Sequence, residues 1–78
     1  MKLPRDVSAN RLIRALTSRG YQIVRQNGSH IRMRHAGPPT HSVTIPNHDS
    51  LKTGTLHSII ASVAEATGRP TKSISALL

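Results

Sequence analysis

The sequence contains no cysteine, no phenylalanine or tryptophan, and only three acidic residues among its 78 residues. Without cysteine, neither a disulfide framework nor a thiolate metal site can form. The acids Asp6, Asp49 and Glu65 are scattered, so they cannot supply the carboxylate cluster of a two-metal nuclease or the carboxylate pair of a glycosidase. The five histidines also lack the spacing of a zinc site. We therefore expect no metal ion and no cofactor.

The chain also has few aromatic residues and no long hydrophobic run. Tyr21 is its only aromatic residue, whereas modules that stack single-stranded bases need several aromatic platforms. Any recognition of nucleic acid must then depend on charge and backbone shape. The most apolar stretch, residues 56–64, is far shorter than the roughly 20 residues of a membrane helix, and the N-terminus lacks a signal-peptide core. These features predict a cytoplasmic protein that does not bind a membrane.

Positive charge is what the sequence has in excess. Eleven Lys and Arg residues give a formal net charge of +8. A small domain with this charge has the electrostatic character of a nucleic-acid-binding protein. Two other interpretations stay open, namely an acidic protein partner and a charge that only keeps the chain in solution.

Hydrophobic periodicity predicts three helices and three strands. The clearest helical pattern places Leu56, Ile59, Ile60 and Val63 at i, i+3, i+4 and i+7. We expect helices at about 9–18, capped by Ser8, from the N-cap Thr53 up to Gly68, and after the N-cap Thr71. We expect strands at about 21–26, 29–35 and 42–45, and in the last of these Val43 and Ile45 point inward while Ser42 and Thr44 point outward. This order predicts a single α+β domain over residues 1–78, with both longer helices on one face of a three-stranded antiparallel sheet.

The first two strands form a predicted hairpin. The dipeptide Asn27-Gly28 is a strong signal for a two-residue turn. In that register Arg25 faces His30, and Val24 faces Ile31 on the buried side of the sheet.

The same alternation leaves an inconsistency at the start of the first strand. His30, Arg32 and Arg34 share the open face with Arg25, and strict alternation would also place Tyr21 and Ile23 there. Either these two apolar residues form a shelf beside the arginines, or a β-bulge switches the register.

His30 lies in a row of fixed positive charge, which suits one particular chemistry. RNA carries its own nucleophile, the 2′-hydroxyl, and imidazole can accept or return its proton near neutral pH. Arginines can stabilise the charge that develops on the phosphate. DNA lacks the 2′-hydroxyl, so the same site would bind DNA without cutting it. A structural, hydrogen-bonded histidine is the alternative interpretation of His30. We expect His41 and His48 to lie in loops and His57 on the surface of a helix.

The order of several short motifs resembles the HicA toxins of bacterial toxin–antitoxin pairs. The residues that carry the resemblance are Leu3-Pro4-Arg5, Val7-Ser8, Gly20-Tyr21, Gly28-Ser29-His30, Ile45-Pro46-Asn47-His48, Leu51-Lys52 and Gly54-Thr55-Leu56. This resemblance implies a double-stranded-RNA-binding-domain-like α-β-β-β-α fold and a metal-independent endoribonuclease that cleaves mRNA and inhibits translation and growth. It also implies a HicB-type antitoxin partner, usually acidic, that blocks the site.

The resemblance assigns the catalytic role to His30, the histidine of the Gly-Ser-His element. We expect Arg25, Ser29, Arg32 and Arg34 to contact the RNA. Many family members carry a second histidine directly after the catalytic one, whereas this chain has Ile31 there. Two alternatives stay open: a non-catalytic RNA- or DNA-binding module of the same fold, and a protein that acts only through its partner.

Overall fold

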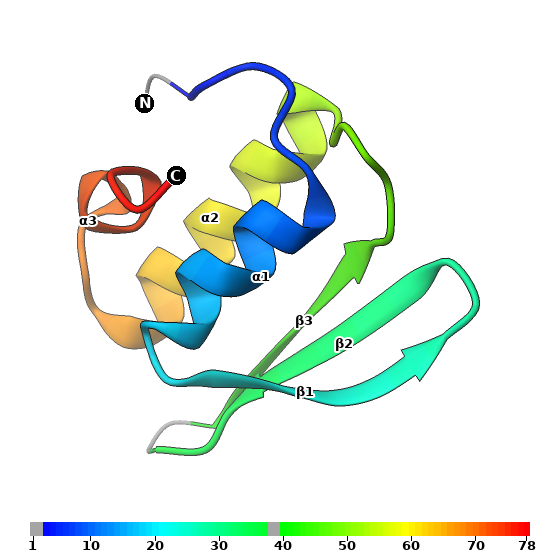
Figure 1. Ribbon diagram of the computed structural model, residues 1–78. Coiled ribbons are helices and arrows are strands. Elements are labelled where there is room, and N and C mark those ends of the chain that lie inside the picture. The colour runs from blue at the N-terminus through cyan, green and yellow to red at the C-terminus, as the bar shows by residue number, and fades with distance from the viewer. Residues whose placement is uncertain (1–2, 38–39) are drawn as a thin grey trace.

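A computed structural model describes residues 3–37 and 40–78 (Figure 1). Its elements, in chain order, are α1 (Ala9–Thr17), β1 (Tyr21–Asn27), β2 (His30–His35), β3 (His41–Pro46), α2 (Thr53–Thr67) and α3 (Thr71–Ser75). The strands form one antiparallel sheet in the order β1-β2-β3. The predicted α+β class and α-β-β-β-α order are confirmed, and the observed bounds of α1, α2 and the three strands lie within one residue of their predictions.

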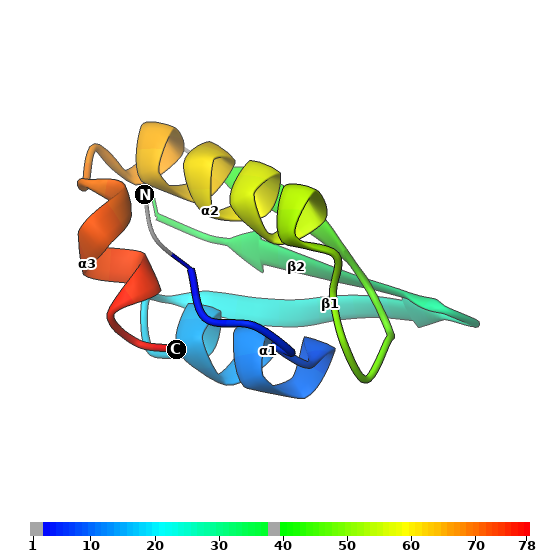
Figure 2. The same ribbon diagram turned by 90° about the horizontal axis from the view of Figure 1, so that it is seen from above.

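The helices and the sheet form two layers. α1 and α2 lie side by side on one face of the sheet, and α3 closes the end between them (Figures 1 and 2). The hairpin of β1 and β2 extends beyond both helices. Within residues 3–37 and 40–78, no helix covers the opposite face of the sheet, which we call the open face (Figures 1 and 2).

Local sequence explains where the helices begin and end. Ser8 caps α1 as predicted, since its hydroxyl accepts a hydrogen bond from the Arg11 N–H at 3.1 Å. Gly68 ends α2 in the left-handed conformation, with φ of 68°. Thr53 and Thr71 were predicted as N-caps, but each is the first residue of its helix, and Lys52 and Pro70 occupy the cap positions.

The hairpin register differs from the prediction by one residue. Asn27 pairs with His30, so the two turn residues are Gly28 and Ser29 and not Asn27 and Gly28. Gly28 has a positive φ of 59°, and Ser29 does not. A glycine with positive φ at the first central position is typical of a type II′ turn, which suits the twist of the flanking strands.

A β-bulge at Val24 resolves the inconsistency in β1. The register shifts between Ile23 and Arg25, so both sides of the bulge keep their inward and outward alternation. Tyr21 therefore enters the core and is only 1% exposed. The prediction that Val24 is buried is wrong, because the bulge removes it from the pairing and leaves it 49% exposed.

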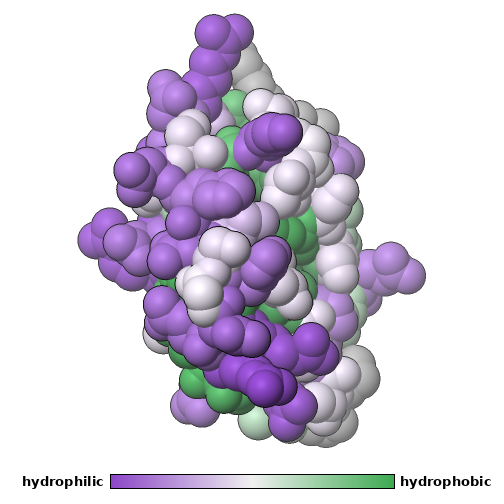
Figure 3. Space-filling model, turned by 90° about the vertical axis from the view of Figure 1, so that its right-hand side faces the viewer, coloured by the Kyte–Doolittle hydropathy of each residue, from purple (hydrophilic) through white to green (hydrophobic). Residues whose placement is uncertain are grey.

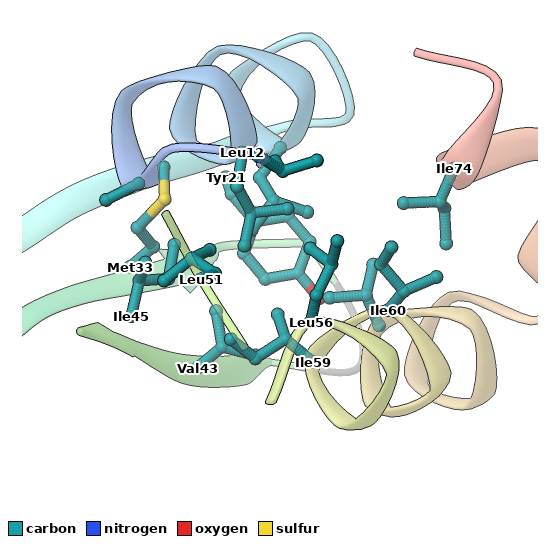
Figure 4. Packing of buried hydrophobic residues seen from close by; sticks show 14 of the residues in the cluster. Leu12, Tyr21, Met33, Val43, Ile45, Leu51, Leu56, Ile59, Ile60 and Ile74 are labelled. Carbon is teal, nitrogen blue, oxygen red and sulfur yellow. The ribbon is translucent and has the colours of Figure 1, made fainter. Parts of the chain in front are cut away.

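The core lies between the sheet and the helices. Figure 4 shows Tyr21 near its centre, with Leu12 of α1 beside it and Ile74 of α3 close to Ile60 of α2. Val43 and Ile45 of β3 point inward as predicted. The apolar residues predicted to form one side of α2 are all buried, namely Leu56, Ile59, Ile60 and Val63. Ile23 pairs with the buried Met33, yet it is 49% exposed because β1 is an edge strand.

Two sets of side-chain hydrogen bonds join the helices to the rest of the fold. His41, which we expected in a loop, begins β3, where its Nδ1 lies 2.7 Å from the Tyr21 hydroxyl and its Nε2 lies 3.0 Å from Ser62 Oγ. With the proton on Nε2, the tyrosine donates to His41, and His41 donates to Ser62. Arg19 of the α1–β1 connection donates to the Ser73 carbonyl at 3.0 Å, which ties α3 to α1.

Tyr21→Phe tests the polar contact in the core. We expect it to lower the free energy of unfolding by about 1 kcal/mol at neutral pH, because His41 Nδ1 loses its partner. Burial raises the pKa of Tyr21 above its ordinary value of 10.0. The folded state therefore binds the phenol proton more tightly than the unfolded state does. As the pH rises from the unfolded pKa through the folded pKa of Tyr21, the free energy of unfolding falls.

Urea denaturation of both proteins at neutral and at strongly alkaline pH measures this effect. Above about pH 10 the wild type should lose stability more steeply than Tyr21→Phe, since all other titrating groups are shared. The same pH dependence in both proteins would contradict this account of Tyr21.

Candidate nucleic-acid interface

The open face of the sheet carries three rows of side chains that run across the strands. Paired residues in antiparallel strands point to the same face, so the register defines each row. The rows, from the hairpin turn toward the other end of the sheet, are Asn27–His30–Pro46, Arg25–Arg32–Thr44 and Gln22–Arg34–Ser42. The predicted residues Arg25, His30, Arg32 and Arg34 are therefore all on this face.

The middle row places two arginines directly opposite each other. Arg25 of β1 pairs with Arg32 of β2, and both side chains are exposed. Like charges at directly opposite positions destabilise a sheet, with Cβ atoms only about 4.5–5.5 Å apart. A bound anion would remove this repulsion and accept hydrogen bonds from both guanidinium groups. The pair is therefore chemically suited to bind an anion.

A hollow of about 240 Å³ lies on the same face. It is lined by Arg25, Asn27, His30, Arg32 and Thr44. Two guanidinium groups and one imidazole thus converge on one space, which suits a phosphate group and a proton acceptor beside it. Figure 3 views the molecule from the side toward which the hairpin points, and hydrophilic side chains cover most of that side.

His30 is the first residue of β2 and is exposed to solvent. Its Nδ1 lies 3.4 Å from Ser29 Oγ, so the turn serine contacts one ring nitrogen and leaves Nε2 for a ligand. Ser29 is therefore placed to orient the ring. Arg34 lies four residues after His30 on β2, outside the residues that line the hollow.

Asn27 and Thr44 line the hollow, yet sequence reasoning gave them no part in the site. Asn27 was placed in the turn, and Thr44 was noted only as an outward-facing residue. A signal was present in Gly28-Ser29, because Gly-Ser is also a two-residue hairpin dipeptide and would have moved Asn27 into the strand.

The four other histidines lie elsewhere in the fold. His35 contacts the Tyr21 ring with 5.2 Å between centroids, and His41 binds the Tyr21 hydroxyl. His57 is exposed on α2, as expected, and His48 lies in the loop after β3. Within residues 3–37 and 40–78, no three His, Asp or Glu side chains gather where they could hold a metal ion.

Comparison with known families identifies the chain. Residues 9–65, well over half of the sequence, match the family described as the HicA toxin of bacterial toxin–antitoxin systems. Comparisons with curated proteins and with solved structures give no match. None of the helices in the described residues is long and apolar enough to cross a membrane. The matched segment contains β1 to β3 with the hollow, and the chain therefore belongs to the HicA family of toxins.

Proposed function

We propose that this toxin is a metal-independent endoribonuclease that cleaves mRNA in the cytoplasm, with His30 as its single catalytic histidine. The observation that carries the proposal is the Arg25–Arg32 pair beside His30 on the open face of the sheet. The pair supplies positive charge for one phosphate group, and His30 supplies a proton acceptor next to it.

The proposed reaction uses the nucleophile that RNA itself provides. His30 Nε2 takes the proton of a 2′-hydroxyl, whose oxygen attacks the neighbouring phosphorus. The bond to the 5′-oxygen of the next nucleotide breaks, and the imidazolium returns the proton to that oxygen. The products are a 2′,3′-cyclic phosphate and a free 5′-hydroxyl. Ser29 would hold the His30 ring, and Arg25 and Arg32 would stabilise the charge on the phosphate.

We further propose that a HicB-type antitoxin neutralises the toxin by covering the same face. The three open-face arginines, Arg25, Arg32 and Arg34, are exposed and lie on two adjacent strands. An acidic partner can pair with them and exclude RNA by occupying the same charges. RNA and antitoxin would then compete for one surface.

Expression in a bacterial host without an antitoxin tests the proposed function. We expect growth and translation to stop, with cleaved transcripts visible by primer extension, and co-expression of the cognate antitoxin to restore growth. Normal growth with intact transcripts, at a confirmed level of folded protein, would contradict the proposal.

A further inference from the structure

We propose that Asn27 determines the base specificity of cleavage and that it selects adenine as the base on the ribose whose 2′-hydroxyl His30 deprotonates. This inference rests on the proposed ribonuclease function. The observed hairpin register moves Asn27 out of the predicted turn and pairs it with His30. The two side chains therefore point to the same face, with Cβ atoms about 4.5–5.5 Å apart.

The charged groups in the hollow suit a part that all nucleotides share. Arg25 and Arg32 are charged donors that suit phosphate, and phosphate contacts carry no base information. Asn27 is different, because its neutral amide presents a donor and an acceptor on two separate atoms, whereas the Thr44 hydroxyl carries both on one oxygen. Among the residues that line the hollow, it is the one amide.

Base stacking cannot provide the discrimination here, because every base has a π-face and stacking tolerates any sequence. The only aromatic residue outside the histidines is Tyr21, and it is buried in the core on the helix side of the sheet. Base identity on the open face must then be read by hydrogen bonds to base edges. Asn and Gln amides pair most characteristically with adenine, where one group donates to a ring nitrogen and the other accepts from the N6 amino group.

The size and place of the hollow fit a single nucleotide. Its volume of about 240 Å³ is below the roughly 300–1,000 Å³ of pockets that enclose larger ligands. In this ribose, the base is attached to the carbon next to the one that bears the reacting 2′-hydroxyl. When His30 contacts that hydroxyl, this base is the one that the neighbouring Asn27 can reach.

The test uses DNA oligonucleotides that carry one ribonucleotide, either A, C, G or U, at the same position. Only the phosphate after the ribonucleotide can be cleaved, so the cleaved position and its base are fixed. We expect the wild type to have a kcat/KM for the A substrate about 5- to 150-fold above that for each other substrate. Asn27→Ala should bring the four values close together by slowing cleavage of the A substrate.

Gln26→Ala is the matched control. It removes an amide from the adjacent position of β1, but Gln26 pairs with the buried Ile31 and so lies toward the other face of the sheet. Gln26→Ala should keep the preference for adenine. The inference is overturned if the wild type does not favour A, if Asn27→Ala keeps that preference, or if Asn27→Ala slows all four substrates equally.

A binding measurement separates this inference from the proposed function. If the wild type cleaves none of the four substrates, the ribonuclease function fails. Binding of the same oligonucleotides with a 2′-O-methyl group at the ribonucleotide then still reports on Asn27. A preference for A that Asn27→Ala removes would support base reading by Asn27, and equal binding of all four by the wild type would overturn it.

Discussion

His30→Ala is expected to slow RNA cleavage by about 10²- to 10⁴-fold, the range that a positioned general base or acid contributes. The variant removes the proton acceptor but leaves Arg25 and Arg32 on the open face. RNA affinity should therefore change little, and the loss should be in kcat. Single-turnover cleavage and equilibrium binding of one RNA measure the two effects separately. Because His30 is exposed at the hairpin end, the fold should keep its stability.

His57→Ala is the matched control for this prediction. His57 is also an exposed histidine, but it lies on α2 in the helical layer, away from the open face of the sheet. It should cleave RNA like the wild type. If His30→Ala cleaves RNA at the wild-type rate, His30 is not the catalytic base. If neither the wild type nor His57→Ala cuts RNA that both proteins bind, the non-catalytic binding module replaces the enzyme.

Replacing Arg25, Arg32 and Arg34 together by alanine is expected to weaken RNA binding about a hundredfold at 0.1 M salt. Each phosphate contact to a single strand contributes about 0.7 to the slope of log affinity against log salt. Three lost contacts should lower this slope by about 2, which is about a hundredfold between 1 M and 0.1 M salt. Fluorescence anisotropy over a salt series measures both the affinity and the slope.

A charge-matched variant tests whether RNA binding depends on the open-face arginines or only on the net charge of the protein. Replacing Arg14, Arg69 and Lys72 by alanine also lowers the formal charge by three, from the wild-type +8, but at exposed positions in and beside the helices. This variant should keep most of the salt slope. If both triple variants lose RNA affinity and salt slope equally, RNA binding depends on the overall charge of the protein. That result would contradict the proposal that RNA binds the open face.

Much of the fold follows from local sequence signals. The stripe on α2, the Ser8 cap and the inward residues of β3 each depend on spacing within a few residues, and the structure confirms them. The position of His30 in a basic row is also readable, because alternation along β2 continues without interruption from His30 to His35.

The parts that sequence could not predict depend on contacts between strands. A shift of one residue in a hairpin changes every cross-strand partner, and both Asn27-Gly28 and Gly28-Ser29 are acceptable turns. The bulge at Val24 then restores the burial of Tyr21, which no local pattern specifies. Consequently the Arg25–Arg32 pair and the place of Asn27 beside His30 emerge only from the observed register.

One measurement tests the central claim most directly. The purified toxin is incubated with EDTA and a short RNA, or with the DNA of the same sequence, and the product ends are identified by mass spectrometry. The account predicts that the RNA is cut with 2′,3′-cyclic phosphate and 5′-hydroxyl ends, that His30→Ala leaves it intact, and that the DNA is bound but not cut. Cleavage of the DNA, or cleavage of RNA only when a divalent cation is added, would contradict a metal-independent reaction that uses the 2′-hydroxyl and His30.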